Sequence, residues 1–165
     1  MSKFLTRLRP ILVMALALVP ASAQMPNPYG APITLEQARK PAAAALAEAA
    51  KNHWTMAVAI VDPAGTLVYF ERMDHTQVAS ADVAIHKART AVQYKRPTKA
   101  LQDALAAGGA GLRILALDGA IPVEGGLPLV VDGKIIGGIG ASGDSSANDS
   151  QCAQAGAAAL AGPAK

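Results

Sequence analysis

Residues 125–143 constrain the fold of this chain more than any other stretch. Two apolar, β-rich runs, 127–131 and 135–141, lie on either side of Asp132-Gly133. An Asp-Gly pair favours a type I′ turn, because both central residues need a positive φ, so the sequence predicts a tight hairpin. The second run contains three glycines, and glycine inside a strand indicates a bulge or a close backbone approach. We therefore expect a helix or a ligand to press against this strand.

The N-terminus has the layout of a secretory signal peptide. Lys3, Arg7 and Arg9 form a positively charged region, residues 11–19 form an apolar core, and residues 21–23 are small, as at a cleavage site. The apolar core is too short to span a bilayer, and no other segment predicts a membrane span. We expect cleavage near Ala23 and a mature protein that is periplasmic or secreted.

Removal of this signal changes the charge of the protein. The chain has 15 Lys and Arg against 12 Asp and Glu, but three of the basic residues lie within residues 1–23. The mature chain is therefore formally neutral, and its composition gives no evidence for nucleic-acid binding. About 142 residues remain, enough for one domain with a real core. The single cysteine, Cys152, allows no internal disulfide, and its apolar helical surroundings predict a buried thiol.

The pattern of helices and strands predicts an α+β fold. Residues 24–33 contain three prolines and predict an extended leader, followed by a single domain at 34–165. A capping box of Thr34 and Gln37 begins the first helix, which Pro41 should kink. Further expected elements are a hairpin of strands 56–61 and 66–72, helices at 81–94 (with Ser80 as N-cap) and 99–107, a strand at 112–117, the glycine-rich hairpin, and a final helix to residue 160. Two hairpins between helices predict a mostly antiparallel sheet flanked by helices.

The helix at 81–94 carries a polar stripe. Asp82, His86, Arg89 and Gln93 are spaced so that they lie on one side of the helix, opposite its apolar face. Asp82 lies one turn before His86, where a carboxylate can orient an imidazole, as it does around metal sites. The same stripe is also consistent with a solvated surface or with an oligomer interface.

Other chemical motifs in the chain are weak. Residues 138–143 match the G-x-G-x-x-G pattern, but no room remains for the next strand of a dinucleotide-binding unit, so close helix packing is the better interpretation. Ser142 lacks a nucleophile-elbow context and is more consistent with a turn or an anion-binding nest. No zinc-binding spacing is present. Of the other histidines, His53 ends a helix and His75 lies in the loop after the second strand.

Several segments together resemble the GlcG/HbpS haem-binding family, which includes the C-terminal domain of PduO-type adenosyltransferases. The resemblance extends over nearly the whole mature chain in the expected order. Its matching segments are residues 59–65, 71–74, 84–91, 125–128, 132–133, 140–143 and 151–156. It implies a profilin-like or GlcG-like domain, assembly into a homo-oligomer, and haem binding in some members.

Three functions follow from the residues and the resemblance. The leading hypothesis is an exported, non-enzymatic haem-binding protein in haem or iron handling or sensing, and two alternatives remain open. One alternative is an enzyme acting on a small molecule in a pocket near Asp74, Lys87 and Gly140. The other is a structural or sensor-accessory oligomer without a ligand, since strands that are apolar on both faces indicate surplus apolar surface.

If haem binds, we expect a histidine to hold its iron, because imidazole is a common axial ligand. His86 is the first candidate and His75 the second. Lys87 and Arg89 are both close enough in sequence to His86 to meet the propionates. Residue 87 points well away from residue 86 on the helix, so Arg89 is the better candidate. Met73 is a candidate sixth ligand, and Asp82 is expected to fix the tautomer of His86.

Overall fold

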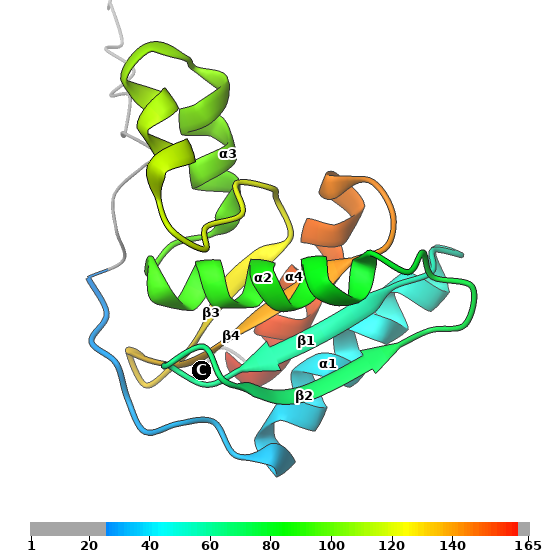
Figure 1. Cartoon of the computed structure of the whole chain (residues 1–165). Helices are drawn as coiled ribbons and strands as arrows, with labels where there is room; N and C mark the ends of the chain where they lie inside the picture. Colours follow the sequence, from blue (N-terminus) through cyan, green and yellow to red (C-terminus); the bar gives the residue numbers. More distant parts are fainter. Residues whose placement is uncertain (1–25, 162–165) are drawn as a thin grey trace, which may run out of the picture.

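The computed structural model describes residues 26–161, so the predicted signal peptide at 1–23 lies outside the described residues. The domain is a four-stranded antiparallel sheet covered by helices on both faces (Figure 1). Its α+β class therefore agrees with the sequence-based prediction. In chain order the elements are α1 (Leu35–Lys51), β1 (Ala57–Val61), β2 (Leu67–Arg72), α2 (Ser80–Gln93), α3 (Thr98–Ala106), the 3₁₀ helix η1 (Gly109–Ala116), β3 (Gly126–Val131), β4 (Lys134–Ser142) and α4 (Ser146–Ala161).

The two predicted hairpins meet in the middle of the sheet. The strand order is β2-β1-β4-β3, and β1 pairs with β4 so that Ala59 lies opposite Gly140. Every residue of β1 is buried, as expected for a strand covered on both faces. The turn between β3 and β4 has positive φ at Asp132 (48°) and Gly133 (72°), which are the angles that an Asp-Gly hairpin turn requires.

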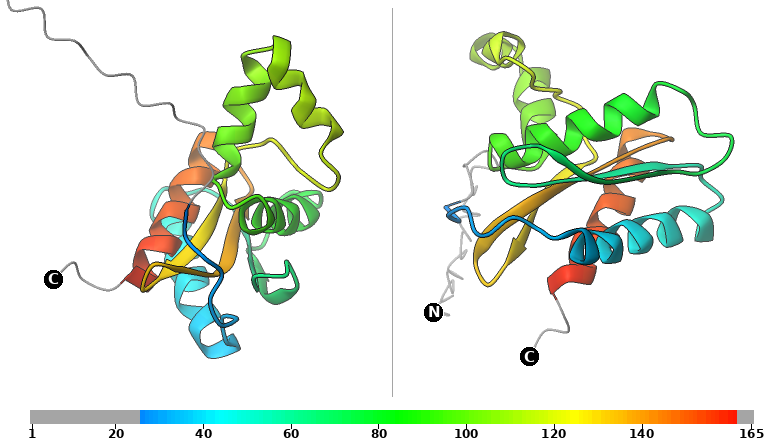
Figure 2. Two further views of the ribbon diagram at one scale, coloured as in Figure 1. Left: turned by 90° about the vertical axis from the view of Figure 1, so that its left-hand side faces the viewer. Right: turned by 60° about the horizontal axis from the view of Figure 1, so that its bottom comes forward.

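Helices cover the two faces of the sheet unequally. α1 and α4 pack side by side on one face, and α2 alone crosses the other (Figures 1 and 2). Because successive side chains of β1 point to opposite faces of the sheet, the hydrophobic core has two parts, one on each face. Val58 and Ile60 face α1 and α4, whereas Ala57, Ala59 and Val61 face α2. Within residues 26–161, no helix has both the length and the apolar character needed to cross a membrane.

The glycines of β4 let α2 approach the sheet closely. A Cβ atom added at Gly138 would lie 2.6 Å from the carbonyl oxygen of Ala88, and one at Gly140 would overlap the carbonyl oxygen of Ala84. The helix contributes small residues, Ala84 and Ala88, to the same contact. The glycine-rich strand is therefore covered by a helix and offers no room for a ligand.

The predicted start of α1 is confirmed, whereas the predicted start of α2 is not. Thr34 caps α1 in a complete capping box with Gln37, and Asn52 forms its C-cap. Pro41 lies inside α1, which runs unbroken from Leu35 to Lys51. Ser80, by contrast, is not an N-cap. It is the first residue of α2, and Ser142 donates a hydrogen bond to its hydroxyl oxygen at 3.2 Å.

The strand predicted at 112–117 is wrong, because the chain forms η1 there. Gly108 and Gly109 both have positive φ, and they turn the chain into a 3₁₀ helix directly after α3. Leu112 and Leu115 are exposed on it, so the apolar run does not enter the sheet. α3 and η1 together stand off from the body of the domain as a separate lobe (Figures 1 and 2).

The segment that precedes α1 lies along the β3–β4 hairpin. Ile135 donates its backbone N–H to Pro28 at 2.9 Å, and Gly30 and Ile33 donate to Ile135 and Ile136 at 2.8 Å each. The ammonium of Lys95 lies 4.4 Å from the centre of the Tyr29 ring. These contacts attach the predicted leader to the sheet.

Candidate functional site

The polar stripe of α2 lies on the surface, as its spacing predicts. Ala84, Ala88, Ala91 and Val92 face the sheet and are buried, while His86 on the other side of the helix is exposed and Arg89 is half-buried. An exposed imidazole on a well-anchored helix is free to meet a ligand.

His86 and Arg89 line one hollow, which we call the α2 groove. Its volume is about 340 Å³, at the lower end of the range of ligand pockets, roughly 300–1,000 Å³. The groove combines an imidazole, a guanidinium and an amide from α2 with backbone and apolar side chains of the loop after η1. Its lining residues are His86, Arg89, Gln93, Gly119, Ala120 and Ile121.

Hydrogen bonds from α2 and from Tyr94, its C-cap residue, position the loop that forms the opposite wall. The Thr90 hydroxyl accepts the backbone N–H of Ile121 at 3.0 Å, and Tyr94 donates its hydroxyl to the carbonyl of Asp118 at 2.8 Å. The Thr90 hydroxyl also donates to the carbonyl of Gly119 at 3.5 Å. Both walls of the groove are therefore attached to one helix.

The β1–β2 turn holds the polar stripe in place. Arg89 donates its Nε–H to the carbonyl of Gly65 at 2.9 Å, and Gln93 donates its amide to the carbonyl of Ala64 at 3.3 Å. The bond at Nε fixes the stem of Arg89, so its terminal guanidinium nitrogens have a restricted range of positions beside the groove.

The other predicted site residues do not join this groove. His75 is exposed in the β2–α2 loop with φ of 65° and is not among the lining residues. Met73 packs against the core between the sheet and helices α1 and α4, on the face opposite α2. Asp82 is exposed one turn before His86, but no hydrogen bond joins these two described side chains. The structure therefore brings together His86 and Arg89 and leaves the other three outside.

Within residues 26–161, no group of three or more His, Cys, Asp or Glu side chains is arranged so that it could hold a metal ion. His86 and His75 are thus single imidazoles, each suited to act as one axial ligand of a larger group. Cys152 is fully buried, as predicted, and burial raises the pKa of its thiol to about 12. A thiol with such a pKa is a poor nucleophile and a poor metal ligand.

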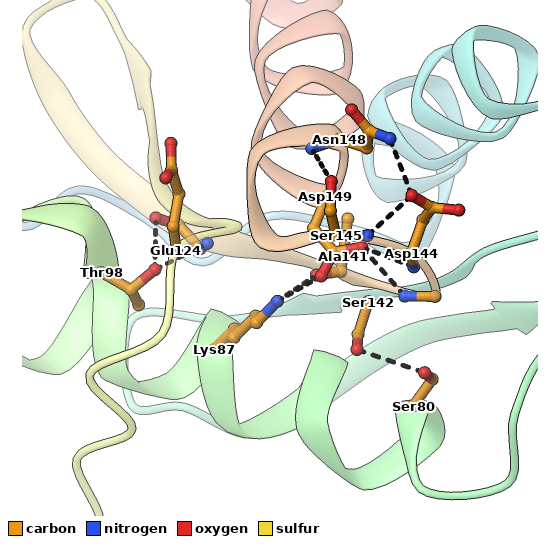
Figure 3. Close-up of polar contacts among 12 residues, drawn as sticks. Ser80, Lys87, Thr98, Glu124, Ala141, Ser142, Asp144, Ser145, Asn148 and Asp149 are labelled. Atoms are coloured by element: carbon orange, nitrogen blue, oxygen red, sulfur yellow. Dashed lines mark hydrogen bonds and ion pairs between the residues drawn. The ribbon is translucent and has the colours of Figure 1, made fainter. Parts of the chain in front are cut away.

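Lys87 takes part in a buried ion pair that the sequence did not reveal (Figure 3). Its ammonium nitrogen lies 2.7 Å from Asp149 Oδ2 and donates to the carbonyl of Ala141 at 3.0 Å. The other oxygen of Asp149 accepts the backbone N–H groups of Gly143 and Asp144 at 2.9 and 3.1 Å. The pair joins α2 to the first turn of α4 across the end of β4.

Burial acts on both partners of this pair. It lowers the pKa of Lys87 and raises the pKa of Asp149, while the mutual hydrogen bond opposes each shift. With side-chain exposures of 1% and 4%, neither group reaches solvent. The pair is therefore a structural link between helices.

The alternative pocket near Asp74, Lys87 and Gly140 is not formed. Lys87 is closed into its ion pair, Gly140 is covered by α2, and Asp74 is exposed in the β2–α2 loop. Close packing of α2 on β4 removes the space that a ligand would need there.

Sequence reasoning missed the second wall of the groove. The Asp118-Gly119 pair is the only local sequence signal for this loop. It directly follows the strand predicted at 112–117 and so indicates no more than the end of that strand. Thr90 and Tyr94, which hold this loop, carry no local sequence signature because their partners lie more than 20 residues away.

Comparison with known proteins decides the family. The family model described as "Haem degrading protein HbpS-like" matches residues 33–158, which is most of the chain. The chain belongs to the HbpS-like family. Protein GlcG of Escherichia coli K12, one curated relative, is 38% identical over 100 residues, covering 61% of this chain and 73% of GlcG.

Solved structures agree with the HbpS-like assignment. A double mutant of HbpS from Streptomyces reticuli matches with a TM-score of 0.72 and 32% identity, over 93% of this chain and 97% of that one. A PduOC:haem complex matches with a TM-score of 0.70 and 32% identity, over 78% and 94% of the two chains. The predicted relation to GlcG, HbpS and PduO is therefore confirmed.

Proposed function

We propose that this HbpS-like protein binds haem in the α2 groove, with His86 as the iron ligand and Arg89 facing a propionate. The observation that carries the proposal is that these two side chains line one hollow. The family description and the solved PduOC:haem complex support haem as the ligand.

The residues of the groove fit a haem group. An imidazole is a common axial ligand, and a guanidinium pairs with a carboxylate through two parallel hydrogen bonds. Ala120 and Ile121 offer apolar contacts to a porphyrin ring. When bound, haem supplies an iron whose ligand and redox chemistry the surrounding residues tune.

A hemin titration of the mature chain tests this proposal. We expect a Soret band that saturates at one haem per chain. Replacing Arg89 by Gln should weaken binding by about tenfold, since a hydrogen bond between charged groups contributes roughly 1.5–3 kcal/mol. Arg72→Gln, at an exposed arginine outside the groove, serves as the matched control. Absence of a saturable Soret change would overturn the proposal.

We further propose that the protein acts outside the cytoplasm, in haem or iron handling. This part rests on the positive, apolar and small-residue segments of residues 1–23. Intact-mass analysis of protein recovered from the periplasm or the medium should give a chain that begins at Gln24. Cytoplasmic material that still begins at Met1 would contradict export.

A further inference from the structure

A second hollow lies between the end of α2 and the projecting lobe of α3 and η1. We call it the lobe cleft, and its volume is about 300 Å³. Its walls come from the residues directly after α2, from α3, and from η1 and the residue after it. The lining residues are Tyr94, Arg96, Leu101, Arg113, Ile114 and Leu117.

The lobe cleft combines an apolar interior with two cationic side chains. Leu101 and Ile114 are only 1% and 6% exposed. Arg96 donates its Nε–H to the carbonyl of Tyr94 at 3.0 Å, which fixes the stem of this side chain. The three ion pairs within residues 26–161 all use lysines, so neither Arg96 nor Arg113 has an acidic partner there.

The lobe cleft is separate from the α2 groove. Leu117 lines the cleft, whereas residues 119–121 line the groove, and Asp118 between them accepts the hydrogen bond of Tyr94. The two hollows thus lie on either side of one anchored loop and share no lining residue. Binding in one does not require binding in the other.

We propose that the lobe cleft binds a small organic anion with an apolar body, such as an aromatic or branched aliphatic carboxylate. The leucine and isoleucine side chains contact the body of such a ligand. The guanidinium groups of Arg96 and Arg113 supply charge-assisted hydrogen bonds to its acid group, in the forked geometry that suits carboxylates and sulfonates. The volume limits the ligand to a compact molecule.

A pair of fluorescent probes tests this site. The anionic probe 8-anilinonaphthalene-1-sulfonate and its uncharged counterpart N-phenyl-1-naphthylamine share one apolar body and differ in the sulfonate. We expect Arg113→Gln to weaken binding of the anionic probe by about tenfold, and to change binding of the neutral probe by less than about twofold. Lys99→Gln is the matched control, because Lys99 is an exposed cation on α3 outside the cleft.

Two further measurements make the result decisive. Hemin affinity should be unchanged in Arg113→Gln, and affinity for the anionic probe should be unchanged in His86→Ala, because each variant alters only one hollow. An Arg113→Gln protein that binds the anionic probe like the unchanged chain would overturn the proposal. Loss of the anionic probe in His86→Ala would also overturn it, because the probe would then occupy the α2 groove.

Discussion

Lys87 and Arg89 are two residues apart on α2 and have opposite environments. Two positions on a helix differ by about 200° in direction, so one side chain faces inward and the other outward. Lys87 forms the buried pair with Asp149, whereas Arg89 lines the α2 groove. The sequence alone predicted that the two side chains diverge. It did not predict Asp149 as the partner, because that contact joins residues 62 positions apart.

Removal of the Lys87 ammonium should strongly destabilise the fold. Lys87→Met leaves the Asp149 carboxylate buried without its cation, which costs about 3–5 kcal/mol of unfolding free energy. Chemical denaturation measures this loss. The matched control, Lys99→Met, removes an exposed pair with Asp103 and should cost no more than about 1 kcal/mol.

A second substitution distinguishes charge from packing. Asp149→Asn added to Lys87→Met removes the buried charge and keeps an oxygen for the N–H groups of Gly143 and Asp144. The double variant should therefore be more stable than Lys87→Met alone. A double variant that is less stable would contradict the assignment of the loss to an unpaired carboxylate.

Elements with strong local signals were predicted well, and those determined by distant contacts were not. The capping box at Thr34 and the Asp132-Gly133 turn are encoded within a few residues, and the structure contains both. The apolar run at 112–117 predicts a strand where the chain forms η1, because a run of that length does not distinguish a strand from a helical segment. The loop at 118–121 takes its position from Thr90 and Tyr94, which no local pattern connects to it.

Because α2 and β4 are in close contact, a single methyl group added to β4 should strongly reduce the stability of the fold. Gly140→Ala places a Cβ against the carbonyl oxygen of Ala84 and should reduce the unfolding free energy by about 2 kcal/mol or more. Gly109→Ala is the control, because its Cβ meets no atom within 4 Å. Only the strain of positive φ remains there, about 1 kcal/mol. Equal losses in the two variants would contradict close packing at Gly140.

At the scale of the whole molecule, several large apolar side chains remain exposed to solvent. Val78, Leu112 and Leu115 are 82%, 54% and 70% exposed. Leu112 and Leu115 lie together on η1, and exposed large apolar side chains of this kind mark interfaces, for which closed symmetric assemblies are the commonest result. We therefore expect the mature chain to form a homo-oligomer. Light scattering should give a mass of at least two chains at micromolar concentration, and a mass near one chain would contradict this expectation.

The whole molecule also explains why only part of the predicted site came together. The helix periodicity of residues 81–94 was enough to place His86 and Arg89 on one side of α2. It gave no information about the sheet, which separates Met73 from His86 by placing them on opposite faces. Which residues share a face of the sheet depends on strand order, and no local pattern contains that order.

The measurement that tests the central claim most directly is a hemin titration of three histidine variants, with circular dichroism to confirm that each is folded. His86→Ala should shift the Soret band and weaken binding by at least about tenfold, the equivalent of 1.4 kcal/mol. His75→Ala and His53→Ala should bind hemin like the unchanged chain, because neither residue lines the α2 groove. Unchanged spectrum and affinity in His86→Ala, with loss of both in His75→Ala, would contradict the assignment of the iron ligand to α2.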